Sequence, residues 1–157
     1  MTNFSDVSLS QAKAKATIYR LLKFRSRSEY EIVAKLKDKK FSSDTIEQVV
    51  CFCKKCGLID DATFTKSWIA SRLAKPLGLR KIRQELKAKG IADEIISAQC
   101  RRLTTDYDEA QAVKQVIRKR IKVYYKLDKT TIYRRLEGYL LRRGFSPEVV
   151  YKELNSI

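Results

Sequence analysis

One phrase of twelve residues occurs three times in this chain, and this repetition limits the possible folds more than any other feature of the sequence. The copies read KLKDKKFSSDTI at residues 35–46, ELKAKGIADEII at 85–96 and YLLRRGFSPEVV at 139–150. Extended on both sides, they align over 22 residues, with offsets of 50 and 54 residues between successive copies. Such self-similarity is typical of tandem structural units stacked on one another.

The aligned copies, residues 29–50, 79–100 and 133–154, share four apolar positions. The apolar sets are Ile32, Ile82 and Leu136; Leu36, Leu86 and Leu140; Phe41, Ile91 and Phe145; and Ile46, Ile96 and Val150. The first two sets lie four positions apart, on one face of a helix, so we expect these side chains to form the core of each unit. A basic residue precedes the turn in each copy (Lys39, Lys89, Arg143), and an acidic residue follows it (Asp44, Glu94, Glu148).

The middle of each copy carries residues that end one helix and begin the next. Gly90 and Gly144 lie where a helix C-terminus favours a left-handed residue. Ser146, followed by Pro and Glu, is typical of a helix N-cap and first turn, and Ser42 takes the same role without the proline. Lys40 replaces glycine in the first copy, so we expect a strained or differently shaped turn there.

A further helical pattern precedes each copy, which gives the unit three helices. Capping signals lie at the boundaries: Ser28 with Glu31, Asp60 or Asp61, and Asp106 or Asp108. We therefore predict an all-α fold with three tandem three-helix repeats at residues 10–56, 60–104 and 106–157, after an N-terminal tail at 1–9. A unit of about 50 residues has a small core. We expect packing against neighbouring units to supply the remaining burial and to give an elongated, curved rod.

The charge of the chain indicates an anionic partner. It carries 34 Lys and Arg residues against 18 Asp and Glu, a net charge of +16, divided as +5 for residues 1–60, +6 for 61–105 and +5 for 106–157. Nucleic acid, an acidic protein groove and a lipid surface all fit this excess. No apolar run approaches the roughly 18 to 20 residues of a membrane span, and the N-terminus lacks the apolar segment of a signal peptide. We expect a cytoplasmic monomer without a membrane partner, directed at a long, periodic anionic target.

Two stretches hold the cations at higher density. One is residues 72–89 of the middle unit, and the other is RKRIKVYYK at 118–126. Basic side chains next to exposed aromatic rings contact phosphates and stack on bases; the alternative is a solvated helix face whose tyrosines close the core. Together with arginines of the third copy, the candidate binding residues are Arg72, Lys75, Arg80, Lys81, Arg83, Lys87, Lys89, Arg118, Lys119, Arg120, Lys122, Tyr124, Tyr125, Arg134, Arg135, Arg142 and Arg143.

The residue inventory argues against catalysis and against a cofactor. The chain has no histidine, which removes the commonest general base and metal ligand, and it has no glycine-rich phosphate loop. Cys51, Cys53 and Cys56 form a C-x-C-x-x-C sequence, but on a helix Cys51 points away from the other two, so a tetrahedral zinc site would require the helix to break. Cys100 aligns with an apolar position and is expected to pack as a small hydrophobe. Trp68, on an apolar stripe, is expected in the core.

A longer run resembles a known family. The sequence CGLIDDATFTKSWIASRLAKPLGLRKIRQELKAKGIADEII at 56–96 is similar to the signature of the RecX family, bacterial regulators of the RecA recombinase. The stretches RSRSEYEIVAKL at 25–36 and YLLRRGFSPEVV at 139–150 resemble the flanking repeats of that family. The resemblance extends from Thr17 to the last residue, and Lys40 departs from it only at a local turn.

This resemblance implies three tandem three-helix repeats and a regulatory activity. It implies as partners the RecA filament and the single-stranded DNA within it, with free DNA as a further candidate. The protein would lie in the helical groove of the filament, bridge neighbouring recombinase subunits and mainly inhibit filament growth, ATP hydrolysis and strand exchange, which affects recombination, DNA repair and the SOS response. The residues leave one alternative open, an autonomous DNA-binding protein with tandem helix-turn-helix-like units.

Overall fold

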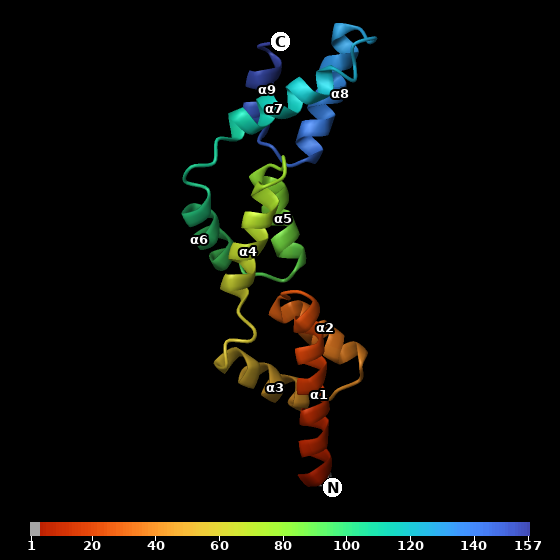
Figure 1. Ribbon diagram of the computed structural model, residues 1–157, viewed down its shortest axis with the longest axis vertical. Helices are drawn as coiled ribbons and strands as arrows, with labels where there is room; N and C mark the ends of the chain where they lie inside the picture. The colour runs from red at the N-terminus through yellow and green to blue at the C-terminus, as the bar shows by residue number, and fades with distance from the viewer. Residues whose placement is uncertain (1–3) are drawn as a thin grey trace.

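Residues 4–157, which the computed structural model describes with side chains from Asp6 onward, form nine helices and no strand. The helices follow one another in three groups of three, stacked along the long axis of an elongated, curved molecule (Figure 1). The start of α1 and the C-terminus lie at opposite ends of this rod. The predicted all-α class with three three-helix repeats is confirmed.

Repeat 1 consists of α1 (Phe4–Phe24), α2 (Glu29–Asp38) and α3 (Ser43–Lys55). Because α1 begins at Phe4, residues 4–9 of the expected N-terminal tail are helical instead, while residues 1–3 lie outside the described part of the chain. The segment contains neither glycine nor proline, which would end a helix, and Asp6 in the first turn complements the positive helix end.

Repeats 2 and 3 have the same order of helices. Repeat 2 comprises α4 (Asp61–Leu73), α5 (Leu79–Ala88) and α6 (Asp93–Leu103), and repeat 3 comprises α7 (Glu109–Ile121), α8 (Lys129–Arg142) and α9 (Pro147–Leu154). In each repeat the second and third helices are the two halves of the repeated phrase, joined by its turn.

Side-chain caps fix several of the predicted helix starts. The Glu31 N–H donates to the Ser28 hydroxyl while the Glu31 carboxylate accepts the Ser28 N–H, so the predicted capping box is present at α2. Asp60 caps α4 and Asp108 caps α7.

Ser146 departs from this scheme. It occupies the N-cap position of α9 with Pro147 in the first turn, as predicted, but its side chain makes no cap hydrogen bond. Its hydroxyl and its N–H both donate to the Glu109 carboxylate at the start of α7, at 2.8 and 3.2 Å. Hydrogen bonds to a charged acceptor are stronger than the neutral cap that they replace.

Each repeat has a core of its own. The four apolar positions shared by the three copies are buried, except that Phe41 is half-buried. The helix pairs in extensive contact lie within single repeats, and the three clusters of buried apolar residues share no member. Each apolar core is therefore formed within one repeat, and the burial that a neighbouring repeat adds lies at the junction, where Ser28 is fully buried.

Neighbouring repeats meet instead through a contact that occurs twice. The start of the second helix of one repeat lies against the turn between the second and third helices of the next. At the first junction the Ser28 hydroxyl donates to the Lys89 carbonyl at 2.7 Å. At the second junction the Gly78 N–H donates to the Arg143 carbonyl at 3.0 Å. Ser28 and Gly78 are equivalent in the repeat register, as are Lys89 and Arg143, so the two junctions share one geometry.

The turn glycines are needed for this contact as well as for the backbone conformation. Gly90 and Gly144 have φ angles of 73° and 82°. A Cβ on Gly90 would overlap the side chain of Tyr30, and one on Gly144 would overlap Lys81. Lys40, in the equivalent turn of repeat 1, has a φ of 64°, which confirms the predicted strain. Lys40 is exposed, and no described helix start docks against its turn.

Candidate nucleic-acid interface

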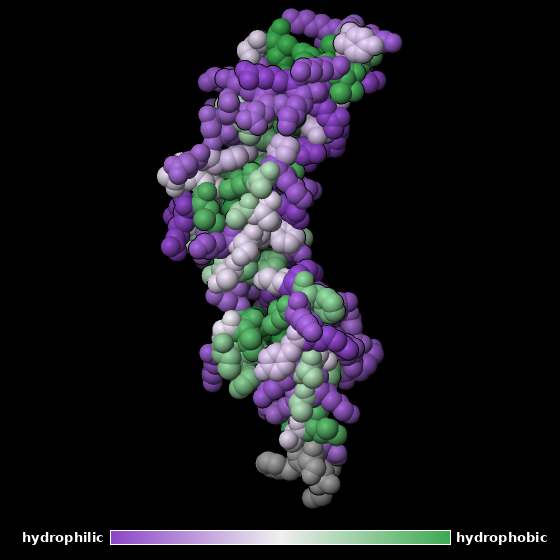
Figure 2. Space-filling view, in the orientation of Figure 1, coloured by the Kyte–Doolittle hydropathy of each residue, from purple (hydrophilic) through white to green (hydrophobic). Residues whose placement is uncertain are grey.

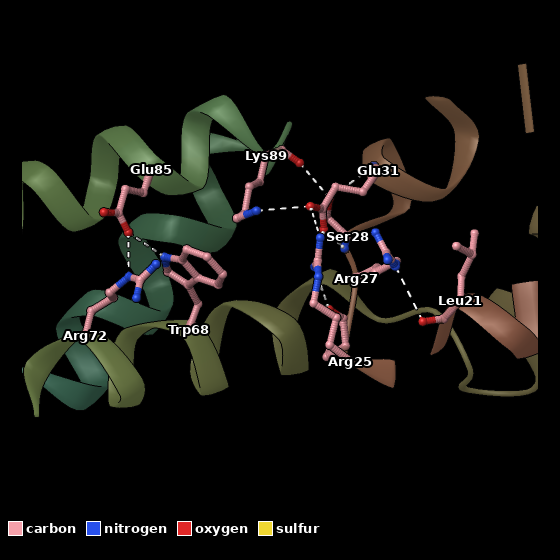
Figure 3. A network of polar contacts seen from close by, with 10 residues as sticks. Leu21, Arg25, Arg27, Ser28, Glu31, Trp68, Arg72, Glu85 and Lys89 are labelled. Carbon is pink, nitrogen blue, oxygen red and sulfur yellow. Dashed lines mark hydrogen bonds and ion pairs between the residues drawn. The ribbon is translucent and has the colours of Figure 1, made fainter. Parts of the chain in front are cut away.

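The first junction is held by ion pairs centred on Glu31 (Figure 3). The Glu31 carboxylate accepts hydrogen bonds from Arg25 of its own repeat at 2.8 Å and from Lys89 of the next repeat at 3.0 Å. Burial alone raises the pKa of Glu31, but the bonds from Arg25, Lys89 and the Ser28 N–H outweigh it and lower this pKa to about 2. Glu31 is therefore ionised at neutral pH and keeps Lys89 at the junction.

Trp68 lies beside this network, at the edge of the repeat 2 core (Figure 3). It stacks on Phe64 with ring centres 5.7 Å apart, in agreement with its predicted core position, but it is only half-buried. The Arg72 guanidinium and the Lys89 ammonium lie 4.3 and 4.4 Å from the centre of its ring. Glu85 accepts hydrogen bonds from both Trp68 and Arg72. Two of the candidate cations, Arg72 and Lys89, are thus already engaged in structural contacts.

The second junction is made mostly by the main chain. Besides the bond from Gly78, the Arg80 N–H donates to the Gly144 carbonyl at 3.2 Å. The Arg143 guanidinium reaches back to the carbonyl of Pro76 at 3.0 Å. The Tyr107 hydroxyl, whose pKa burial raises to about 12, donates to a carbonyl of the loop before α5. These contacts fix the turn of repeat 3 against the start of α5.

Three candidate cations converge at this second junction. Arg80 and Lys81 from α5 and Arg142 from the end of α8 line a surface hollow of about 520 Å³. Arg80 and Arg142 are exposed and Lys81 is half-buried, and none of the three forms an ion pair within the described residues. The fold therefore brings together basic residues that are about 60 positions apart in the sequence.

The cationic and aromatic residues of repeat 3 form a second group. The guanidinium groups of Arg120 and Arg143 lie 4.1 and 4.9 Å from the ring centre of Tyr139. Tyr124 packs against the repeat 3 core, with Arg135 at 5.8 Å from its ring, whereas Tyr125 is 73% exposed. Of the two tyrosines, Tyr124 therefore closes the core, as the alternative interpretation expected, and Tyr125 is exposed, with the Lys126 ammonium 5.4 Å from the centre of its ring.

The remaining candidate residues are more dispersed. Lys87 forms an ion pair with Asp93 at 2.9 Å, and Arg83 is half-buried. Lys75 and Lys119 line one hollow of about 190 Å³ between repeats 2 and 3. The candidates that are exposed without belonging to these groups are Arg118, Lys122 and Arg134. Hydrophilic side chains are spread over the viewed face of all three repeats, with apolar patches between them (Figure 2).

Sequence reasoning missed some members of these groups. Gln84 lines the hollow of the second junction beside the three cations. Tyr139 makes cation–π contacts with two arginines. Gln84 lies within the basic stretch at 72–89 but carries no charge, and Tyr139 lies outside both basic stretches. No signal in the sequence places either residue, because the junction forms only when the repeats dock.

The cysteines do not form a common site. Cys53 is buried, which raises the pKa of its thiol, while Cys51 and Cys56 are exposed and α3 ends just before Cys56. Cys100 is buried, as predicted from its apolar position. Among the described residues no group of three His, Cys, Asp or Glu side chains is placed to hold a metal ion. No described helix combines the length and the apolar character needed to cross a membrane.

The fold and its two equivalent junctions define an all-helical protein of tandem three-helix repeats, and comparison with known proteins identifies the class further. Residues 14–53 match "RecX, first three-helix domain", residues 60–98 match "RecX, second three-helix domain" and residues 106–154 match "RecX, third three-helix domain". The chain belongs to the RecX family.

Individual relatives agree with this assignment. The regulatory protein RecX of Amycolatopsis mediterranei is 32% identical over 140 residues, which cover 88% of this chain and 79% of that protein. That of Prosthecochloris aestuarii is 34% identical over 137 residues, 87% of each chain. A crystal structure of regulatory protein RecX superimposes with a TM-score of 0.82 at 25% identity, covering 96% of this chain and 74% of the other. RecX from Lactobacillus salivarius has the same fold, with a TM-score of 0.81 at 21% identity, covering 96% and 99% of the two chains.

Proposed function

We propose that this protein regulates the RecA recombinase by lying in the helical groove of the RecA–single-stranded DNA filament. There it bridges neighbouring recombinase subunits and mainly inhibits filament growth, ATP hydrolysis and strand exchange. It acts by binding rather than by catalysis, as a monomer in the cytoplasm. The family supports this proposal through the name of its members, regulatory protein RecX.

The distribution of free cations along the rod is the observation that carries the proposal. Within residues 6–157, seven of the 34 Lys and Arg side chains are in ion pairs. All three repeats keep unpaired cations, and the repeats are arranged end to end (Figure 1). A rod with charge along its length suits a long anionic groove better than a small ligand, because each repeat adds contacts to the same polymer.

The monomer is supported by the cores. Each repeat encloses its own buried apolar cluster, so no second copy is needed to complete one. The exposed apolar side chains are distributed over several helices and loops.

The competing function, autonomous DNA binding, predicts a different dose response. The recombinase is first assembled on single-stranded DNA until no bare DNA remains, and substoichiometric amounts of the protein are then added. ATP hydrolysis and strand exchange are measured over time. Inhibition at a small ratio of protein to recombinase is the expected result. If inhibition follows only the amount of bare DNA that the protein occupies, the regulator proposal is wrong and the autonomous function replaces it.

A charge-reversal variant links this assay to the structure. The triple variant Arg80→Glu, Lys81→Glu and Arg83→Glu in repeat 2 is expected to weaken the inhibition. Circular dichroism checks that the variant remains folded. A comparison variant reverses three exposed, unpaired cations of α1, namely Lys13, Arg20 and Lys23; it changes the net charge equally and measures the share of repeat 1 in the inhibition. Unchanged inhibition by the first variant would remove this part of repeat 2 from the interface.

A further inference from the structure

We propose that the hollow at the second junction, between Arg80, Lys81 and Arg142, holds a backbone phosphate of a nucleic acid. The inference deepens the proposed function and rests on it, since the filament would present this phosphate to the rod. It concerns one position, shared by two repeats, rather than the general positive charge of the surface.

The lining of the hollow is suited to an anion. Besides the three cations it consists of Gln84, Leu141, Gly144 and Pro147, so it contains no carboxylate. Arginine presents a planar fork of donors that matches two phosphate oxygens, and lysine and glutamine add single donors. Three like charges facing one hollow repel one another, and a bound anion relieves that repulsion.

The cations are not needed to build the junction. The turn of repeat 3 is fixed there by main-chain bonds, from Gly78 to Arg143 and from Arg80 to Gly144, and by the close approach of Gly144 to Lys81. None of these contacts uses the charged end of Arg80, Lys81 or Arg142. The positive charge is therefore unexplained by the packing of the repeats.

The first junction provides an internal comparison, because it has the same geometry with different residues. At the positions equivalent to the lining of the hollow, it has Tyr30, Glu31, Ala34, Lys87, Ala88, Gly90 and Asp93. Two of these are carboxylates, and both are satisfied: Glu31 pairs with Arg25 and Lys89, and Asp93 pairs with Lys87. The docking geometry thus tolerates acidic residues, and three unpaired cations are found only at the second of the two junctions.

The exposure of the site favours a polymer phosphate over a small buried anion. Arg80 and Arg142 are both exposed, so the hollow is open to a strand that passes along the rod. Tyr139, near the same end of α8 as Arg142, is flanked by the guanidinium groups of Arg143 and of Arg120 from α7, which offer further contacts to adjoining phosphates or bases. A single-stranded nucleic acid gains from such neighbouring contacts, whereas inorganic phosphate gains only from the hollow itself.

The test measures the affinity of the full chain for fluorescein-labelled oligo(dT), by anisotropy over a series of salt concentrations and without any recombinase. The double variant Arg80→Gln with Arg142→Gln is expected to bind roughly tenfold more weakly, with a salt slope reduced by about 0.7, the amount that the loss of one phosphate contact removes. The matched control is Arg101→Gln with Arg102→Gln on α6, which removes two exposed, unpaired arginines of repeat 2. It is expected to change the affinity much less.

A second variant removes the risk that folding is disturbed. Lys81→Glu introduces the residue type that the first junction carries at the equivalent position, so the junction geometry accepts it. It is expected to weaken oligo(dT) binding at least as much as the double glutamine variant, with an unchanged melting temperature. Equal losses in the junction variants and in the α6 control would overturn the proposal, because affinity would then follow net charge alone.

Two further measurements are needed. One distinguishes a nucleic-acid phosphate from free phosphate in the hollow, and the other distinguishes the phosphate site from the proposed regulation of the filament. If millimolar inorganic phosphate raises the melting temperature of the wild type but not of Lys81→Glu, and oligo(dT) binding is the same in both, the hollow is a free-anion site and the nucleic-acid assignment is wrong. The filament assay is scored separately. Junction variants that lose oligo(dT) binding in a protein that never inhibits the filament would leave the phosphate site standing and overturn the regulator function instead.

Discussion

Gly144 lies directly against the main chain of Lys81, so the absence of a side chain on this glycine sets how closely repeat 3 approaches repeat 2. The contact fixes the second junction and, with it, the convergence of Arg80, Lys81 and Arg142. The same relationship joins Gly90 to Tyr30 at the first junction. Two glycines of the repeated phrase therefore hold the rod together.

Gly144→Ala is expected to destabilise the protein by about 2–4 kcal/mol. Alanine is disfavoured in the left-handed backbone conformation of this position, and its Cβ would in addition overlap Lys81. Urea unfolding measures the loss. Gly57→Ala is the matched control: Gly57 has a φ of 71° but no atom within 4 Å of the added Cβ, so only the backbone cost of about 1–2 kcal/mol remains. Similar losses in both variants would show that the close approach at Gly144 is unimportant.

Lys40→Gly is expected to stabilise repeat 1 by about 0.5–1 kcal/mol. The φ of 64° is strained for lysine, and the relief exceeds the entropy that glycine adds to the unfolded chain. Thermal unfolding of this variant is compared with that of Lys39→Gly, where φ is −82° and glycine is expected to destabilise. A loss of stability in Lys40→Gly would contradict the assigned turn conformation.

Leu86→Ala is expected to cost about 2–5 kcal/mol, as the truncation of a fully buried leucine does. The exposed Leu58 serves as the control, since its replacement by alanine should change stability by less than about 1 kcal/mol. Both are measured by urea unfolding. A urea unfolding curve of Leu86→Ala that coincides with that of the wild type would refute the repeat register.

Acid is expected to weaken the first junction through Glu31. Its pKa is about 2 in the folded protein, below the usual value, so its contribution to stability is complete above about pH 5 and disappears as the pH falls toward 2. Glu31→Gln should lower the melting temperature at pH 7 and lose this part of the acid dependence. Glu47→Gln, at an exposed and unpaired carboxylate, should leave the pH profile unchanged. Parallel profiles for wild type and Glu31→Gln would exclude the assigned role.

The tyrosine pair of repeat 3 should respond unequally to truncation. Tyr124→Ala removes a ring that packs on the core and is expected to lower the melting temperature. Tyr125→Ala removes an exposed ring and should keep the stability while weakening oligo(dT) binding by about 1–3 kcal/mol, the value of one stacked base. Full binding by Tyr125→Ala would show that this ring does not touch the ligand.

The apolar columns of the repeat were predictable because helix periodicity acts locally. Ile32, Ile82 and Leu136 are four residues from their buried partners in each copy, and all three are fully buried as predicted. The junctions were not predictable in the same way. Ser28 and Lys89 are 61 positions apart, and the local sequence around neither residue predicts their contact.

The candidate site could be predicted only in part from the sequence, for the same reason. The density of basic residues along the sequence selected Arg80, Lys81 and Arg142 as candidates. It also selected Lys89, which forms an ion pair with Glu31. Whether a cation is free depends on carboxylates that the fold brings near it. Ser146 illustrates the same limit, since Glu109, 37 positions away, takes the hydroxyl that a local rule assigns to the helix end.

The separation of the three cores has a mechanical consequence. Bending the rod at either joint stretches a few hydrogen bonds and ion pairs, such as those of Glu31 or Gly78, and leaves every apolar cluster enclosed. A change in the angle between two repeats would therefore expose no apolar core, and its cost would fall on the polar contacts and glycine contacts of a single junction.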